Sequence, residues 1–389
     1  MKKYISFLIL AVWLFSCIRG FSAAPSVSAQ SAVILDAASG RVLYNKNMEK
    51  RSGMASTTKI MTAITALEYG NLEDTVKVSS TAAGVEGSSM YLSAGEEITL
   101  ENLLYGLMLV SGNDAATAVA EHVGGSVEKF AGMMNDKAKQ IGAMNTHFDN
   151  PHGLATDTHY TTAKDLAMIT AYGLKNEKFA EIVATKSKKV PWQGKSYQRQ
   201  LNNHNKLLAM YDGCIGVKTG FTKATGRCLV SAVKRSGMTL ICVTLNAPND
   251  WDDHMKLYED AFSCYSAEPL LAAGQEIGEV DVKGGTENSV KAVIPSDCYF
   301  PVTEEEKGKI NIIHELNSSL EAPVRTGQTV GKAGVELNGE RFLCYPIVSD
   351  LDVQRRSIVF RERTLDLKGN MQKVFYLWLT VFQNSGENL

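Results

Sequence analysis

Three short clusters of polar side chains could carry out covalent chemistry in this chain of 389 residues. The first cluster is Ser56-Thr57-Thr58-Lys59, at the start of a stretch with helical periodicity. A serine three residues before a lysine lies on the same face of a helix, so the two side chains can meet. The helix N-terminus adds free N–H groups and the positive end of the helix dipole. Ser56 and Lys59 could therefore act as nucleophile and general base without a histidine.

A lysine that acts as a base must lose its own proton first. The pKa of a free lysine is about 10.4, so less than about 0.1% would be neutral at pH 7. Burial or a nearby cation must therefore lower the pKa of Lys59. The spacing alone carries little information, because it recurs at Ser126 and Lys129 and at Ser231 and Lys234. We expect Ser126 inside a helix and Ser231 near the end of a strand, so neither repeats the setting of the first cluster.

The second cluster, Ser111-Gly112-Asn113, lies between two predicted helices. A loop in this place can direct a hydroxyl and an amide into a cleft. Taken by itself, the cluster could equally be a turn that caps the second helix.

The third cluster, Lys218-Thr219-Gly220, lies on a predicted strand. Alternation along a strand directs Lys218 and Gly220 to one face and Thr219 to the other. We expect Gly220 to let a substrate backbone approach closely, because it has no side chain. Alone, this cluster could be a solvent-facing strand end. The three clusters in this order, each in its required local structure, are a strong signal for a catalytic site.

The elements that must position these clusters fall into helices and strands. Helical periodicity recurs over residues 56–69, 100–109, 115–123, 127–141, 163–172 and 251–264. Strand-like runs occur in a hairpin over 32–44 and at 216–222, 227–233 and 239–245. This layout predicts an α+β fold with a mostly antiparallel sheet, in a catalytic domain over residues 30–268. Short β-like runs punctuated by Gly, Pro and Asn then predict a small β-rich domain over residues 269–362.

The N-terminal segment has the composition of an export signal. Lys2 and Lys3 precede an apolar run over residues 5–15, and small residues follow up to Ala29. This pattern predicts a signal peptide at residues 1–29 with cleavage after Ala29. The alternative, an uncleaved anchor, is disfavoured because the apolar run is short for a membrane span.

The C-terminal segment, residues 363–389, contains an apolar run over 374–382 with four aromatic residues and lysines upstream. Nine helical residues reach about 14 Å, less than half of a hydrocarbon core of about 30 Å. A terminal helix docked on the protein would explain the run. The aromatic and basic residues instead favour an amphipathic helix that anchors the chain to a membrane surface.

Composition excludes some classes of partner. The net charge of −2 gives no general attraction to nucleic acid, so we expect no nucleic-acid partner.

The spacing of the cysteines beyond residue 29 supports neither a metal site nor an assigned disulfide pair, and we expect buried free thiols. The seven histidines contain no HExxH motif of a zinc peptidase; they are His122, His147, His152, His159, His204, His254 and His314.

From about residue 32 to 264 the sequence resembles the low-molecular-mass penicillin-binding proteins, the serine D-Ala-D-Ala carboxypeptidases. The likeness rests on the three clusters together with further motifs. These are Gly87-Ser88-Ser89-Met90, the segment 103–109 with Asp114-Ala115-Ala116, Asn150-Pro151-His152-Gly153-Leu154, Asn205-Lys206-Leu207-Leu208, and Gly216-Val217 with Phe221-Thr222. The resemblance implies a serine β-lactamase/transpeptidase-like domain, then a β-rich domain and an amphipathic tail.

The resemblance also implies a role for each residue of the clusters. Ser56 would attack the carbonyl between two D-alanines, Lys59 would take its proton, and Ser111 would relay a proton to the leaving group. We further expect the positive charge of Lys218 to lower the pKa of Lys59.

For substrate binding, Asn113 would hold the substrate's amide, while Lys218 and Thr219 would bind its terminal carboxylate. Backbone N–H groups of Ser56 and Phe221 would form the oxyanion hole. The expected substrate is the peptidoglycan stem peptide, β-lactams would be covalent inhibitors, and no cofactor or metal is expected. The enzyme would act outside the cytoplasmic membrane.

Two other activities share part of this pattern. A class A β-lactamase would need a deacylating glutamate between the second and third clusters. Glu177 and Glu181 lie there, but neither stands in a Glu-x-x-Leu-Asn setting. A penicillin-binding scaffold without turnover is the other alternative, and intact Ser56 and Lys59 argue against it.

Overall fold

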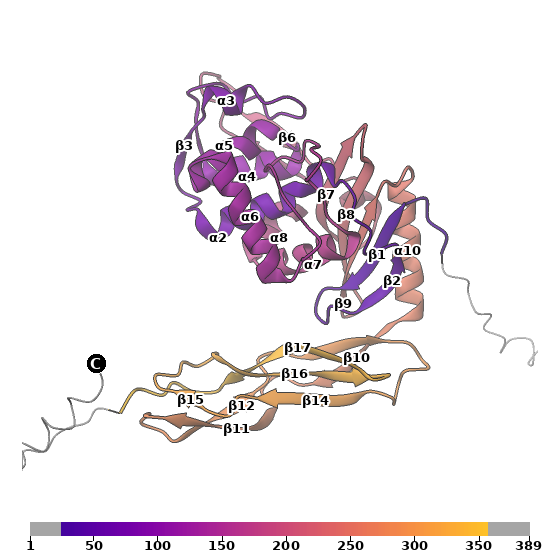
Figure 1. Cartoon of the computed structure of the whole chain (residues 1–389), viewed down its shortest axis with the longest axis vertical. Coiled ribbons are helices and arrows are strands. Elements are labelled where there is room, and N and C mark those ends of the chain that lie inside the picture. Colours follow the sequence, from indigo (N-terminus) through magenta and orange to yellow (C-terminus); the bar gives the residue numbers. More distant parts are fainter. Residues whose placement is uncertain (1–24, 357–389) are drawn as a thin grey trace, which may run out of the picture.

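The computed structural model describes residues 25–356 of the chain. Figure 1 shows a larger part with helices and a sheet, and a smaller, elongated part made of strands. The predicted signal sequence up to residue 24 and the predicted amphipathic tail at 363–389 lie outside the described residues.

A five-stranded sheet forms the centre of the catalytic domain, in the order β2-β1-β9-β8-β7. Every neighbouring pair in it is antiparallel. The strands are β1 (Ser31–Asp36), β2 (Val42–Lys46), β7 (Cys214–Thr222), β8 (Gly226–Arg235) and β9 (Met238–Leu245). Because β7 stands at the edge, the backbone groups on its free side are open to a ligand.

Helices cover both faces of this sheet. On one face lies α10 (Asp250–Cys264), whose Leu257, Tyr258 and Ala261 share an apolar cluster with strand residues. The larger cluster on the other face holds most of the remaining helices. The remaining helices are η1 (Ala55–Thr58), α2 (Lys59–Tyr69), α3 (Ser80–Ala83), α4 (Leu100–Leu109), α5 (Asn113–Gly124), α6 (Val127–Ile141), α7 (Ala163–Gly173), α8 (Glu177–Ala184) and α9 (Leu207–Met210). Of these, α2 to α8 contribute residues to the larger cluster.

Helix α2 is the central element of this helical layer. Every residue from Lys59 to Ala66 is buried, and α2 contacts α4, α5, α6, α7 and α8. A helix surrounded on all sides has little freedom to shift, so its first turn is held in a fixed place. Two short hairpins complete the domain: β3 (Thr75–Lys77) with β4 (Glu97–Thr99), and β5 (Ser187–Val190) with β6 (Arg199–Asn202).

The predicted α+β architecture is confirmed, with some local corrections. Ser56 lies in the 3₁₀ turn η1, and the α-helix begins at Lys59. Asn113 is the first residue of α5, so the second cluster is part loop and part helix. The expectation that Ser126 lies inside a helix is wrong: it is the N-cap of α6, and its hydroxyl accepts a bond from the Lys129 N–H.

Residues 25–30 pack against the catalytic domain. Val27 and Ala29 are buried in the cluster under α10. The carboxylate of Asp253 accepts hydrogen bonds from the backbone N–H groups of Ser28 and Ala29 and from the Ser28 hydroxyl, at 2.7–3.0 Å. The predicted cleavage after Ala29 would remove these contacts from the processed chain.

The second domain consists of strands. Its main sheet has the order β14-β16-β17-β12-β11-β15, and β10 pairs with β13. The strands are β10 (Ser266–Leu271), β11 (Glu276–Lys283), β12 (Ser289–Val293), β13 (Cys298–Val302), β14 (Asn311–Leu316), β15 (Leu320–Glu321), β16 (Thr329–Leu337) and β17 (Glu340–Ser349). Since β10 begins at Ser266, the β-rich domain starts three residues before the predicted boundary. An ion pair between Arg41 and Glu306 joins the two domains.

Three further features bear on the sequence predictions. The six cysteines of the described part are free, and Cys228, Cys242 and Cys298 are buried while Cys264 is exposed. Within residues 25–356, no helix has both the length and the apolar character needed to cross a membrane. No group of metal-binding side chains occurs in the same range.

Candidate active site

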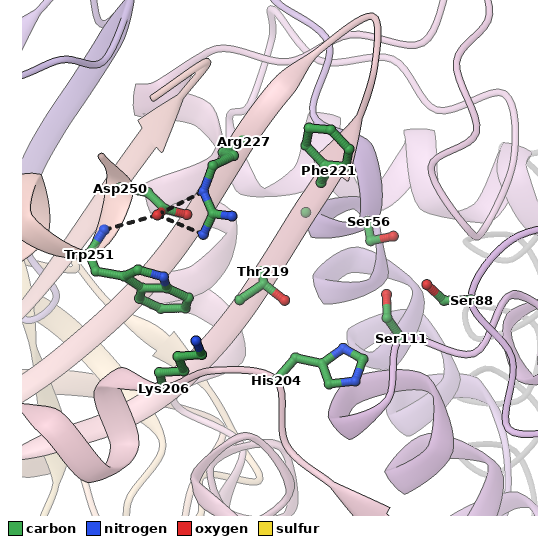
Figure 2. A pocket seen from close by; sticks show the side chains of 11 residues that line it. Ser56, Ser88, Ser111, His204, Lys206, Thr219, Phe221, Arg227, Asp250 and Trp251 are labelled. Atoms are coloured by element: carbon green, nitrogen blue, oxygen red, sulfur yellow. Dashed lines mark hydrogen bonds and ion pairs between the residues drawn. The ribbon is translucent and has the colours of Figure 1, made fainter. Parts of the chain in front are cut away.

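The three clusters converge on one cleft between β7 and the helical layer. The cleft has a volume of about 370 Å³, and Figure 2 shows the side chains around it. Its lining consists of Ser56, Ser88, Ser111, His204, Lys206, Thr219, Gly220, Phe221, Arg227, Asp250 and Trp251. Lys59, Asn113 and Lys218 are buried directly behind this surface.

The turn η1 places the nucleophile. A 3₁₀ helix has three residues per turn, so side chains three apart are aligned. Lys59 Nζ accordingly lies 3.2 Å from Ser56 Oγ. Ala55, the residue before the serine, has a φ of 47°, in the left-handed region that non-glycine residues rarely adopt.

The amine of Lys59 has three hydrogen-bond partners, which differ in whether they can donate as well as accept. Two are carbonyl-type oxygens that can only accept, Asn113 Oδ1 and the backbone oxygen of His152, both at 2.7 Å. The third is the Ser56 hydroxyl, which can also donate. A neutral amine has two N–H groups and one lone pair, so it satisfies all three partners when the serine O–H points at its nitrogen. The geometry therefore fits lysine as a base.

The electrostatic surroundings favour the same neutral form. Lys59 is completely buried, and this burial lowers its pKa well below the usual value. The positive charge of Lys218 lowers that pKa further, while Asp114 acts in the opposite direction. Burial thus contributes more than Lys218, although both lower the pKa as the sequence predicted.

Residues of the second cluster face the same cleft from its other side. Ser111 has a φ of 62°, and its Oγ, buried within the described structure, has no hydrogen-bond partner there. Figure 2 shows this hydroxyl directed toward Ser56. Asn113 Nδ2 donates to the Glu86 carbonyl at 2.7 Å, so one of its two N–H bonds stays available.

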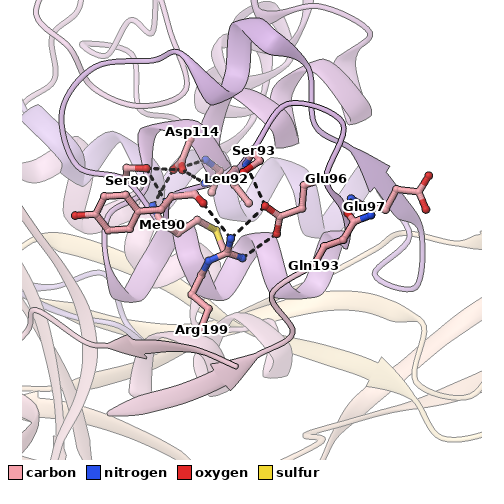
Figure 3. Close-up of polar contacts among 11 residues, drawn as sticks. Ser89, Met90, Leu92, Ser93, Glu96, Glu97, Asp114, Gln193 and Arg199 are labelled. Carbon is pink, nitrogen blue, oxygen red and sulfur yellow. Dashed lines mark hydrogen bonds and ion pairs between the residues drawn. The ribbon is translucent and has the colours of Figure 1, made fainter. Parts of the chain in front are cut away.

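The loop between α3 and β4 is fixed by a separate network, shown in Figure 3. The Asp114 carboxylate accepts bonds from the Ser89 hydroxyl and from the N–H groups of Met90 and Leu92, at 2.6–3.1 Å. An ion pair between Arg199 and Glu96 lies beside it, and both side chains are 3% exposed. This loop carries Ser88 to the rim of the cleft.

Strand β7 forms the opposite wall. Thr219 lines the cleft, whereas Lys218 is 1% exposed and its Nζ donates to the Thr219 carbonyl at 2.9 Å. The cleft lining does not include Lys218. Burial lowers the pKa of Lys218 to about 7.

Gly220 also allows a close approach that the sequence analysis did not predict. A Cβ at this position would lie 3.1 Å from the Met54 oxygen and equally close to the backbone nitrogens of Ser56 and Thr57. The missing side chain therefore lets the enzyme's own nucleophile turn approach β7. The consequence is that the backbone nitrogen of Ser56 lies close to Gly220 of β7.

His159 supports the nucleophile turn, which the sequence analysis did not foresee. Its Nδ1 accepts from the Asp149 N–H at 3.1 Å, so a neutral ring carries its proton on Nε2. Nε2 lies 2.7 Å from Thr58 Oγ1, which in turn donates to the Ala55 oxygen at 2.8 Å. Burial lowers the pKa of His159 to about 4, which keeps this tautomer neutral.

Several residues of the cleft could not be found from the sequence. His204, Lys206, Arg227, Asp250 and Trp251 come from a loop, a neighbouring strand and the start of α10. Of these five, Lys206 alone belongs to a motif quoted above, and the sequence analysis gave it no role. The backbone oxygen of His152, in the motif over residues 150–154, is a direct partner of Lys59.

The chain was compared with known proteins. Residues 20–249 match the family described as D-alanyl-D-alanine carboxypeptidase, and residues 265–355 match the C-terminal domain of penicillin-binding protein 5. The D-alanyl-D-alanine carboxypeptidase DacF of Bacillus subtilis is 34% identical over 348 residues, covering 87% of this chain and 89% of the relative. DacA of Escherichia coli is 30% identical, with 83% of each chain covered.

Solved structures agree with these matches. The structure of penicillin-binding protein 5 from Haemophilus influenzae superposes with a TM-score of 0.66 at 30% identity, covering 86% of this chain and 99% of the other. A mutant of the Streptomyces K15 DD-transpeptidase gives a TM-score of 0.59 at 35% identity and covers 61% of this chain and 99% of the other. Since both domains are matched and the clusters meet in one cleft, the chain belongs to the serine-type D-alanyl-D-alanine carboxypeptidases, the low-molecular-mass penicillin-binding proteins.

Proposed function

We propose that this enzyme removes the terminal D-alanine from peptidoglycan pentapeptide stems through an acyl-enzyme on Ser56. The observation that carries the proposal is the contact set of Lys59. Its buried nitrogen has two acceptor-only partners and the Ser56 hydroxyl at 3.2 Å. Burial and the charge of Lys218 lower the pKa of this amine and so favour its neutral form next to the nucleophile.

In the acylation step, the Ser56 O–H proton passes to Lys59 while Oγ bonds to the carbonyl carbon of the penultimate D-alanine. The carbonyl oxygen becomes an oxyanion, which the N–H groups of Ser56 and Phe221 stabilise. Collapse of this intermediate breaks the C–N bond. A proton reaches the leaving amine through Ser111, whose Oγ has no other partner in the described structure.

In the deacylation step, water adds to the ester carbonyl and Lys59 takes its proton. The C–Oγ bond breaks, Ser56 regains a proton, and the shortened stem leaves with a new carboxylate. Asn113 has one free N–H to hold the stem's amide, and the Thr219 hydroxyl faces the place of the terminal carboxylate. A β-lactam would enter the same path, and its ring-opened acyl-enzyme would block the site.

Two glutamates raised the β-lactamase alternative. The Glu181 carboxylate is bound to the Tyr105 hydroxyl at 2.5 Å and to Lys178 at 2.8 Å. Neither Glu177 nor Glu181 lines the cleft. No observation on the described residues therefore favours a glutamate-driven deacylation.

The expected location follows from the proposed substrate, the predicted signal peptide at residues 1–29 and the predicted amphipathic tail. We propose export to the cell-wall space, with the tail at 363–389 lying on the outer face of the cytoplasmic membrane. Sedimentation of the full chain with anionic lipid vesicles, compared with a chain that ends at residue 362, tests the tail. Equal sedimentation of both proteins would exclude an anchor there.

The activity is tested by measuring D-alanine release from a pentapeptide stem with the wild-type enzyme and Ser56→Ala. Release should fall by more than about 10⁴-fold in the variant, because the nucleophile is lost. Labelling by a fluorescent penicillin should vanish as well. Failure of the wild type to release D-alanine, alongside rapid penicillin hydrolysis, would replace the carboxypeptidase with a β-lactamase.

A further inference from the structure

A second pocket lies beside the nucleophile turn, and none of the roles proposed so far uses it. Its volume is about 400 Å³. Ala55 belongs to the wall of this pocket, while the next residue, Ser56, belongs to the wall of the cleft. The α-carbons of consecutive residues are about 3.8 Å apart, so the pocket begins one residue away from the nucleophile. We call it the η1 pocket.

The direction of the bound stem follows from the roles proposed above. The terminal carboxylate lies at the Thr219 hydroxyl, and the scissile carbonyl lies at the N–H of Phe221. Figure 2 shows these two residues in succession along β7. The stem residues before the scissile bond must therefore continue past Phe221, toward the turn that joins β7 to β8. An extended peptide can follow this path, because β7 is an edge strand.

That turn forms one wall of the η1 pocket. Strand β7 ends at Thr222, and Ala224 and Thr225 of the turn line the pocket. The residue that precedes the acylated D-alanine in the stem is the third, a diamino acid. Its α-carbon is about 3.8 Å from that of the D-alanine. The side chain of the third residue is therefore the part of the stem that is placed to enter the pocket.

Most polar side chains of the pocket wall already have partners within the protein, but Asp157 differs. Both ring nitrogens of His159 are occupied, Nε2 by the Thr58 hydroxyl and Nδ1 by the Asp149 N–H. The Thr156 hydroxyl donates to the Asp149 carboxylate. The Asp157 side chain is exposed and has no hydrogen bond or ion pair with the residues that the structure describes. Its carboxylate is free to accept a cationic donor.

The positive charge of the pocket belongs to Arg51, which is oriented but not used up. Its Nε and Nη2 donate to Asn145 Oδ1 at 3.3 and 2.9 Å, and its guanidinium lies 4.7 Å from the centre of the Tyr160 ring. Among residues 25–356, neither Nη1 nor an ion pair with Asp157 adds a further contact. A guanidinium held in one plane with a free donor is suited to a carboxylate. The pocket thus presents one free group of each charge.

We propose that the η1 pocket binds the side chain of the stem's third residue and selects one that ends in both an ammonium and a carboxylate. Asp157 binds the ammonium, and Arg51 binds the carboxylate. The inference rests on the proposed function and names the diamino acid of its substrate. Meso-diaminopimelate carries both groups, whereas lysine carries only the ammonium. Arg51 and Asp157 lie outside the cleft lining, so they determine specificity without touching the reacting atoms.

The test uses three soluble pentapeptides, L-Ala-γ-D-Glu-X-D-Ala-D-Ala, in which X is meso-diaminopimelate, lysine or norleucine. Release of D-alanine gives kcat/KM for each peptide. For the wild type, kcat/KM should fall in that order, because each step removes one of the two charged contacts. Each step should be about 3- to 10-fold, since exposed charge pairs contribute less than buried ones.

Two variants assign the contacts. Asp157→Asn should lower kcat/KM for the diaminopimelate and lysine peptides by about 3- to 10-fold and leave the norleucine peptide within about twofold of the wild type. Arg51→Gln should lower kcat/KM for the diaminopimelate peptide alone. Arg51→Lys should restore part of that loss, because it keeps the charge. Ratios between peptides do not depend on the fraction of folded enzyme.

Asp136 provides a matched control. It is a carboxylate on α6 with 72% of its side chain exposed, and it lies outside the η1 pocket. Asp136→Asn removes the same charge from the protein, so it should leave all three peptides unaffected. A loss like that of Asp157→Asn would mean that net charge, rather than the pocket, sets the preference.

The remaining outcomes separate the parts of the proposal. Equal turnover of the three peptides by the wild type, or equal losses on all three in Asp157→Asn, would overturn binding of the third residue in this pocket. Equal losses on the diaminopimelate and lysine peptides in Arg51→Gln would overturn the role of Arg51. Absence of D-alanine release from every peptide would instead overturn the proposed function itself.

Discussion

Two regions of this chain contain the same spacing of serine and lysine at the start of a helix. Ser56 and Lys59 lie at the junction of η1 and α2, and Ser126 and Lys129 lie at the start of α6. Their surroundings differ completely. Lys59 is fully buried, while Lys129 is exposed to solvent.

The two hydroxyls are also used differently. Ser126 Oγ accepts the Lys129 N–H and so caps its helix in the usual way. The Ser56 hydroxyl makes no such cap and instead faces the amine of Lys59. A third pair, Ser231 and Lys234, lies on β8, where an odd spacing directs the two side chains to opposite faces. Burial and neighbouring groups, rather than spacing, therefore make a nucleophile.

The largest expected effect that separates the pairs is loss of the base. Lys59→Met should slow acylation by a fluorescent penicillin by about 10²–10⁴-fold at pH 7, because a positioned base contributes that much. Lys129→Met should leave the rate unchanged. Similar slowing in both variants would mean that the buried position of Lys59 has no chemical importance. Thermal unfolding of both proteins checks that each is folded.

The next effect concerns the cation behind β7. Removing the charge of Lys218 should raise the pKa of Lys59, since that charge now lowers it. A higher pKa means that Lys59 becomes neutral only at higher pH. The acid limb of the kcat/KM profile of Lys218→Met should therefore move to higher pH. An acid limb that stays in place would contradict the coupling of the two lysines.

A smaller effect is expected from His159, because it supports the turn η1 that holds Ser56. The pair of Ser126 and Lys129 has no such turn. His159→Ala removes the donor to Thr58 and should slow acylation by about 5- to 10-fold through misplacement of Ser56. His159→Gln retains an N–H donor and should restore part of the rate. If alanine and glutamine variants lose stability equally and neither loses rate, the contact is only structural.

The smallest effect belongs to the second pair itself. Ser126→Ala removes a helix cap and should lower the free energy of unfolding by about 1 kcal/mol. D-alanine release should stay at the wild-type level. Urea unfolding together with the release assay measures both quantities, and a loss of activity larger than the loss of folded protein would contradict the assignment of Ser126 as a cap.

Much of the fold could be predicted from local patterns. The hairpin at the N-terminus, the helices over 100–109 and 127–141 and the strands around the third cluster lie within a few residues of their predicted bounds. Periodicity indicates which face of an element is apolar, so long periodic elements can be predicted from the sequence. The misplacement of Ser126 came from a helix boundary, where periodicity gives no information and the cap decides.

The sequence predicted which residue types form the candidate site better than it predicted the contacts between them. Ser56, Lys59 and Ser111 meet as expected, and the close approach of η1 to Gly220 was not predicted. Arg227 and Trp251 enter the cleft through sheet register and through the start of α10. Neither of these depends on local sequence.

The sequence by itself determined the chemical groups, their order and the elements that carry them, because these follow from side-chain type and short-range periodicity. Only the tertiary structure decided which of these lysines is buried with a lowered pKa. The physical reason is that a pKa and a direction of approach depend on burial and on neighbours distant in the chain. Lys59, enclosed by Asn113, His152 and Lys218, differs from Lys129 in those respects alone.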